Sequence, residues 1–124
     1  MTHNLIGRPM DDQERSVVAH LLAVSFNGAA VLREQLAVAR VVGNWKPEGS
    51  VSFDISVPAD AGAAQISDGV APVTAYVTDE EGAYLGELIL WIANGKLAGL
   101  EYAWVTDTPP GRLPQVSLIQ VLPK

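Results

Sequence analysis

Two apolar runs separated by Asn94-Gly95 dominate the hydrophobic pattern of this sequence, over residues 84 to 105. Both central residues of a tight type I′ turn need a positive φ, which Asn and Gly tolerate best. The pattern therefore predicts a β-hairpin with a two-residue loop. Neither of its faces is polar, whereas a sheet with one face in water normally alternates apolar and polar residues. Either the chain itself covers both faces, or one of them binds a partner.

The turn also predicts which hairpin residues share a face, because a two-residue loop places Ala93 opposite Lys96 and fixes the pairs that follow. Counting back from the turn puts Trp91 opposite Ala98. One face is then expected to carry three aromatic residues, one carboxylate and three aliphatic residues: Trp91, Tyr102, Trp104, Glu87, Leu85, Ile89 and Leu100. The other face is expected to carry Glu101, opposite Leu88.

The N-terminal part of the chain has helical spacing. Asp11 and Glu14 have the spacing of a capping box, and apolar residues recur at helical intervals after them, so a helix is expected over residues 11–25. A second, short helix is expected over residues 29–36, with Asn27 as a candidate cap.

Alternation with a period of two predicts strands over residues 50–57 and 72–78. Residues 38–45 suit either a helix or a strand, and the strand is preferred because Gly43-Asn44 disfavours a helix. Turns or loops are expected at 46–49, 58–69, 79–82 and 106–111, and a last edge strand over 116–121.

This order of elements predicts an α+β fold, in which two N-terminal helices pack on an antiparallel meander sheet of four to five strands. Residues 1–9 are expected to form a flexible N-terminal arm, and residues 10–124 a single domain. A chain of 124 residues can bury a core without disulfides or metals.

Composition narrows the classes of function. The chain has no cysteine, which suits a reducing cytoplasm and removes thiol chemistry. The chain has a net charge of −6 and no basic stripe of the kind that nucleic-acid binding needs. An acidic surface favours a basic protein partner instead. No apolar run is long enough to span a membrane, and no signal peptide is expected.

No catalytic constellation stands out, so no catalytic residue, cofactor or metal is expected. The two histidines, His3 and His20, have no second ligand at metal-binding spacing. There is no serine nucleophile elbow and no phosphate-binding loop. Glu87 and Glu101 are expected on opposite faces of the hairpin, which argues against a two-carboxylate glycosidase.

Two features of the hairpin allow more than one interpretation. Glu101 on an apolar face needs a hydrogen-bond partner, such as an arginine or the 106–111 loop, or it serves as a polar anchor for a partner. The aromatic group Trp91, Tyr102 and Trp104 is ordinary in a core, but such rings are also enriched in interface cores.

The segment Gly95-Lys96-Leu97-Ala98-Gly99-Leu100-Glu101-Tyr102, with Thr106-Asp107-Thr108-Pro109 and Leu113-Pro114 after it, resembles a motif of small bacterial proteins, largely actinobacterial, without an established function. Upstream positions are similar too: Phe26, Gly28, Ala30, Leu32, Arg33, Gln35 and Leu36. The resemblance covers most of the chain and supports the fold. It implies no activity, although related hairpins occur in contact-dependent toxin immunity systems. The Cys/Gly-rich turn of many relatives is absent from 43–49, so a metal role there does not carry over.

Three hypotheses follow. The first is a non-enzymatic protein-binding domain, immunity- or antitoxin-like, that binds through Trp91, Tyr102, Trp104 and Glu87. The second is an enzyme or small-molecule binder that uses a cleft between helices and sheet, with Glu101, Tyr102 and Asp107 as its polar groups. The third is a homodimer whose sheet face is purely structural.

Overall fold

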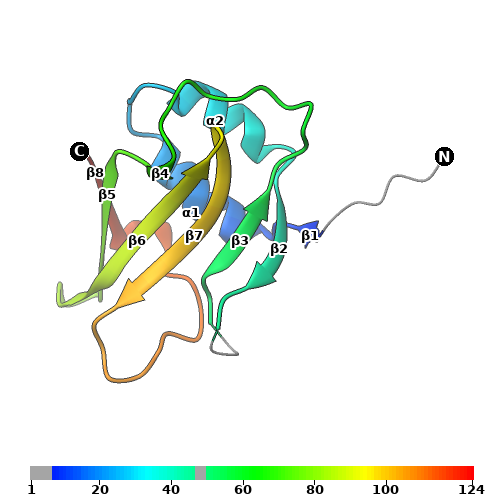
Figure 1. Ribbon diagram of the computed structural model, residues 1–124. Coiled ribbons are helices and arrows are strands. Elements are labelled where there is room, and N and C mark those ends of the chain that lie inside the picture. Colours follow the sequence, from blue (N-terminus) through cyan, green and yellow to red (C-terminus); the bar gives the residue numbers. More distant parts are fainter. Residues whose placement is uncertain (1–6, 47–49) are drawn as a thin grey trace.

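The computed structural model describes residues 7–46 and 50–124, which form two helices, one 3₁₀ turn and an eight-stranded sheet (Figure 1). The bounds are β1 (Arg8–Pro9), α1 (Asp12–Leu22), α2 (Ala29–Leu36), β2 (Arg40–Asn44), β3 (Phe53–Ser56), β4 (Gly69–Val70), β5 (Val73–Thr78), β6 (Tyr84–Ala93), β7 (Lys96–Trp104), η1 (Val116–Leu118) and β8 (Ile119–Pro123).

The predicted α+β class is confirmed, but the sheet is larger than four to five strands and is not a meander. Its order is β1-β2-β3-β7-β6-β5-β8, with β4 pairing to β6, and every pairing in the described residues is antiparallel. The hairpin β6–β7 lies in the middle, as Figure 1 shows. The meander fails because the 58–69 connection carries the chain past the hairpin. Strand β3 therefore pairs with β7, and β5 pairs with β6.

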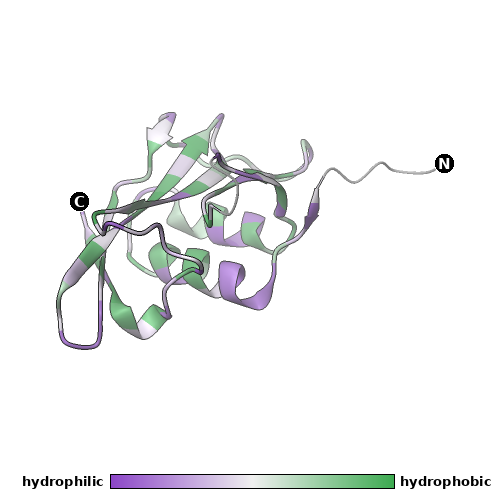
Figure 2. Cartoon of the chain, turned by 90° about the horizontal axis from the view of Figure 1, so that it is seen from below, coloured by the Kyte–Doolittle hydropathy of each residue, from purple (hydrophilic) through white to green (hydrophobic). Residues whose placement is uncertain are grey.

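The molecule has two layers, with both helices on one face of the sheet (Figure 2). In each strand with an alternating pattern, every second side chain points toward the helices. The buried core joins helix residues such as Val17, Leu21 and Leu32 to strand residues such as Phe53 and Leu90. Two short helices cover one sheet face, and no helix in the described residues packs on the other.

Helix α1 begins at the predicted capping box. The Asp11 carboxylate accepts a hydrogen bond from the Glu14 backbone at 2.7 Å, and the Glu14 carboxylate accepts one from the Asp11 backbone at 2.9 Å. Glu14 also accepts two hydrogen bonds from Arg8, at 2.8 and 2.7 Å. Burial raises the pKa of Glu14, but the bonds from Arg8 and Asp11 outweigh it, so the pKa lies below its ordinary value.

Helix α2 has the predicted bounds, and it holds the hairpin turn. Its N-cap residue is Gly28 rather than Asn27, whose side chain donates to the Gln65 carbonyl instead. Gln35 on this helix is 2% exposed. Its amide donates to the carbonyls of Gly62 and Gly95 at 2.8 and 2.9 Å and accepts from the Leu97 backbone at 3.0 Å.

The hairpin turn has the predicted backbone, with φ of 54° at Asn94 and 73° at Gly95. The 58–69 segment packs against it, because the Ala64 backbone donates to the Gly95 carbonyl at 2.8 Å. A β-carbon on Gly95 would lie 2.4 Å from the Ala64 carbonyl oxygen. Glycine is thus required here for its conformation and for the close approach of two backbones.

Other predicted elements are confirmed with changed lengths. Residues 38–45 contain a strand, β2, and α1 ends at Leu22 rather than 25. The 50–57 strand is shorter, as β3, and the last edge strand begins after η1, as β8. The sheet extends into the expected arm through β1. Residues 1–6, including His3, and residues 47–49, where a turn was predicted, lie outside the described residues.

Gly95→Ala tests the packed turn. A left-handed alanine costs about 1–2 kcal/mol on its own. At Gly95 the contact with the Ala64 carbonyl adds to this cost, so we expect a loss of about 3 kcal/mol or more in urea unfolding. Gly82→Ala is the control, since Gly82 also has a positive φ, 89°, but a β-carbon there meets nothing within 4 Å. Equal losses in the two variants would contradict the packed turn.

Glu14→Gln tests the capping pair through its pH dependence. A lowered folded-state pKa contributes stability above the ordinary value of 4.5, and this stability is lost as the pH falls through the folded-state pKa. We expect the variant to be about 1 kcal/mol less stable at pH 7, since Arg8 is half exposed, and the difference to shrink toward pH 3. Glu34→Gln, at an exposed position of α2, is the control for the loss of one carboxylate.

Candidate functional site

The sheet face opposite the helices, called the outer face below, is the candidate functional site. Alternation along the strands places every second side chain on it, and these are half-buried or exposed, in contrast to the core side. Acidic and aromatic side chains prevail there. We define the acidic–aromatic patch as Trp45, Asp54, Tyr76, Tyr84, Glu87, Ile89, Trp91 and Glu101.

A β-bulge decides which hairpin residues reach the outer face. Ala93 pairs with Lys96 and Ile92 with Leu97 as predicted, but Trp91 pairs with Gly99 rather than Ala98. Ala98 is therefore an extra residue in β7. From there to the end of the strand, each β7 residue lies one position away from the counted register, which moves it to the opposite face.

The prediction that Trp91, Tyr102 and Trp104 share a face is consequently wrong. Trp91 lies on the outer face with Glu87, whereas Tyr102 is 4% exposed on the core side, opposite Leu88. Trp104 is half-buried against the core. The placement of Glu101 on the opposite face from Glu87 is wrong for the same reason, since Glu101 pairs with Ile89 on the outer face.

Two tryptophan–carboxylate pairs stand on the outer face. The Trp91 indole donates to Glu101 at 3.1 Å, and the Trp45 indole donates to Asp54 at 2.9 Å. Gly99 pairs with Trp91 on one side and with Asp54 on the other, so the residue between the two pairs has no side chain. The hydrogen-bond partner of Glu101 is thus Trp91, and no arginine or 106–111 loop residue bonds Glu101 among the described residues.

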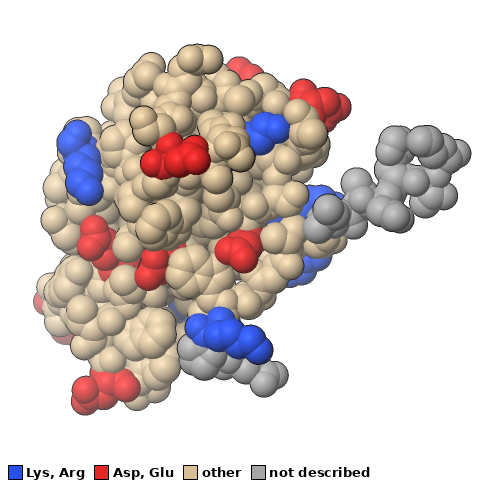
Figure 3. Space-filling model, in the orientation of Figure 1, with Lys and Arg blue, Asp and Glu red and all other residues tan. Residues whose placement is uncertain are grey.

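The electrostatics of this face are acidic. Figure 3 shows acidic side chains over β3, β6 and β7 among uncharged atoms, with basic side chains closer to the margin. Lys96 bonds within the protein, because its ammonium donates to the carbonyls of Pro58 and Ala59 at 3.0 and 3.1 Å. Tyr76 and Tyr84 form an edge-to-face pair, with ring centroids 6.2 Å apart. A partner for this face would have to offer positive and apolar groups.

The predicted cleft with Glu101, Tyr102 and Asp107 is not assembled. Glu101 lies on the outer face, Tyr102 on the core side, and Asp107 is exposed in the loop after β7. No group of three metal-ligating side chains occurs among the described residues. His20 is placed structurally, with its Nε2 2.9 Å from the Ile119 carbonyl oxygen.

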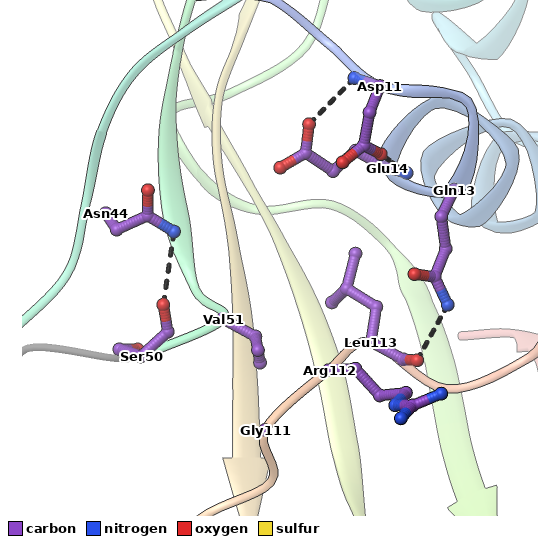
Figure 4. A pocket seen from close by; sticks show the side chains of 9 residues that line it. All are labelled: Asp11, Gln13, Glu14, Asn44, Ser50, Val51, Gly111, Arg112 and Leu113. Carbon is purple, nitrogen blue, oxygen red and sulfur yellow. Dashed lines mark hydrogen bonds between the residues drawn. The ribbon is translucent and has the colours of Figure 1, made fainter.

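A polar cleft of about 470 Å³ lies beside the start of α1 (Figure 4). Most of its polar groups bond within the protein. Asp11 and Glu14 bond each other, the Gln13 amide donates to the Leu113 carbonyl at 2.8 Å, and Asn44 donates to the Ser50 carbonyl at 3.1 Å. We therefore assign these groups a structural role.

Comparison with protein-family models, with curated proteins and with solved structures gives no match. The resemblance of residues 95–114 to a bacterial family stays a prediction. No helix within residues 7–46 and 50–124 is long and apolar enough to cross a membrane.

Sequence analysis missed Trp45, Asp54, Tyr76 and Tyr84 as site residues. A signal existed for two of them, since alternation already placed Asp54 and Tyr76 on the polar sides of their strands. For Glu101 the hydrophobic pattern predicted the wrong face of the sheet, because an apolar run gives no clear sequence signal for a bulge.

Deletion of Ala98 tests the bulge. The deletion leaves Ile92–Leu97 and Trp91–Gly99 as consecutive pairs and changes no face, so we expect a folded protein that loses about 1–2 kcal/mol of stability. Deletion of Ile89, in the regular part of β6, reverses the faces of half that strand and should unfold the protein. Circular dichroism and urea unfolding distinguish the two results. If both deletions unfold the protein, the bulge is not a separable feature.

Proposed function

We propose that this protein is a non-enzymatic binding protein that docks a basic protein partner on the acidic–aromatic patch. The observation that carries the proposal is the pair of tryptophan–carboxylate contacts, Trp91–Glu101 and Trp45–Asp54, on a sheet face that neither α1 nor α2 covers. Tryptophan is among the residues most enriched in binding hot spots, and rings fixed by hydrogen bonds lose little entropy on binding.

The carboxylates favour a basic partner. Each accepts its indole bond through one oxygen, which leaves the second oxygen of Glu101 and of Asp54 without a bond within the described residues. Lysine or arginine side chains of a partner would complete them. The net charge of −6 would steer such a partner during encounter.

The same charges disfavour a homodimer built on this face. A two-fold interface brings one patch against its own copy, so Asp54, Glu87 and Glu101 would meet like charges. The enzyme hypothesis is less favoured as well, since its three polar groups lie on different parts of the molecule. We propose occlusion of the partner as the mode of action, as in immunity proteins and antitoxins.

The test is capture of cell proteins by the native chain and by two charge-reversal variants. Glu101→Arg lies in the patch and Glu34→Arg lies at an exposed position of α2, and each changes the net charge by the same amount. We expect a basic protein to bind the native chain and Glu34→Arg. We expect Glu101→Arg and Trp91→Ala to weaken its Kd at least tenfold, with stability within about 1 kcal/mol of the native chain.

Raised salt should weaken native binding and leave the residual binding of Glu101→Arg less affected. The proposal is wrong if every captured protein binds Glu101→Arg as tightly as the native chain. It is equally wrong if light scattering shows a dimer that Trp91→Ala dissociates.

A further inference from the structure

The register of the outer face brings the two tryptophan–carboxylate pairs together around one point of the sheet. Trp91 on β6 pairs with Gly99 on β7, which pairs with Asp54 on β3, so these three residues form one row across the strands. The next row of the same face carries Ile89 on β6 and Glu101 on β7. Asp54 and Glu101 are therefore diagonal neighbours on adjacent strands, with Cα atoms roughly 7–8 Å apart.

The two indoles reach this point from opposite sides. The strand order is β2-β3-β7-β6, so β3 and β7 are the inner pair. Trp91 extends from β6 to Glu101 on β7, and Trp45, directly after β2, extends to Asp54 on β3. A β-carbon on Gly99 would lie 3.6 Å from a carboxylate oxygen of Asp54, so the missing side chain leaves room beside that carboxylate. The two indoles and two carboxylates around Gly99 are called the cation site below.

The carboxylates of the cation site lack a cation of their own. Neither Asp54 nor Glu101 forms an ion pair with any residue that the structure describes. Their like charges repel at this separation, so a positive group between them would lower the free energy of both. Trp45 and Trp91 are partly exposed, and their N–H groups are already bonded, so the rings offer a partner their π faces.

We propose that the cation site receives the guanidinium of a single arginine of the basic partner, an inference that rests on the docking function proposed above. A guanidinium is planar and has five donors in fixed directions, so it can stack on an indole while its edges donate to two carboxylates. The ammonium of lysine is compact and strongly hydrated, and it gains less from an aromatic face. Arginine and tryptophan are also the residue types most enriched in binding hot spots.

The test titrates the native chain with three blocked pentapeptides of glycine whose central residue is arginine, lysine or citrulline. NMR follows the three indole N–H signals. We expect the arginine peptide to shift Trp45 and Trp91 with one common Kd and to leave Trp104, which packs against the core, unchanged. The lysine peptide should bind about threefold to fivefold more weakly, and the uncharged citrulline peptide should show no saturable binding.

Matched substitutions test whether one cation bonds both carboxylates. Glu101→Gln and Asp54→Asn each remove one charge and keep an acceptor for the indole, and either should weaken the arginine peptide about fivefold or more at both tryptophan signals. Glu34→Gln, at an exposed position of α2, should not. Gly99→Ala fills the space beside Asp54 and should weaken binding, whereas Gly43→Ala, whose β-carbon meets nothing within 4 Å, should leave it unchanged.

The proposal is overturned if no peptide shifts Trp45 and Trp91, or if lysine binds as tightly as arginine. It is also overturned if Glu101→Gln weakens the response of Trp91 alone, because the two pairs would then bind separate cations. These failures differ from failure of the docking function. A captured basic protein that binds the native chain and not Glu101→Arg would still support docking on the acidic–aromatic patch, with the single arginine excluded.

Discussion

The anchoring of the hairpin turn to α2 is the constraint on which the rest of the structure depends. The buried side-chain amide of Gln35 forms hydrogen bonds with the backbones of Gly62, Gly95 and Leu97. It therefore joins α2 to the 58–69 connection, to the hairpin turn and to the start of β7. A buried amide in this position must satisfy both donors and its acceptor, which allows very few arrangements. The turn, the helix layer and the crossing connection are therefore fixed relative to one another.

From this anchored end, one extra residue determines the surface chemistry. The bulge at Ala98 brings Glu101 beside Trp91 and sends Tyr102 inward. The outer face thereby gains a carboxylate that fixes an indole, and the core side gains the aromatic ring of Tyr102. The side chains on both faces of the sheet are thus set by the same one-residue shift.

The asymmetry of the layers gives the two faces of the sheet their different character. The helices cover the core side, so the side chains there are buried and mostly aliphatic. No helix of the described residues covers the outer face, and its aromatic rings lie among carboxylates. An uncovered sheet face of this kind suits a protein partner.

Local chemistry in the sequence was sufficient to predict the capping box of α1, the bounds of α2 and the Asn94-Gly95 turn, because each depends on residues within one or two turns of chain. The alternation of β3 and β5 also predicted their buried sides. The strand order, the pairing of β3 with β7 and the bulge at Ala98 were decided only by the tertiary structure. They depend on contacts between distant segments, such as Gln35 with Gly95, and an apolar run has no local mark that distinguishes one register from the next.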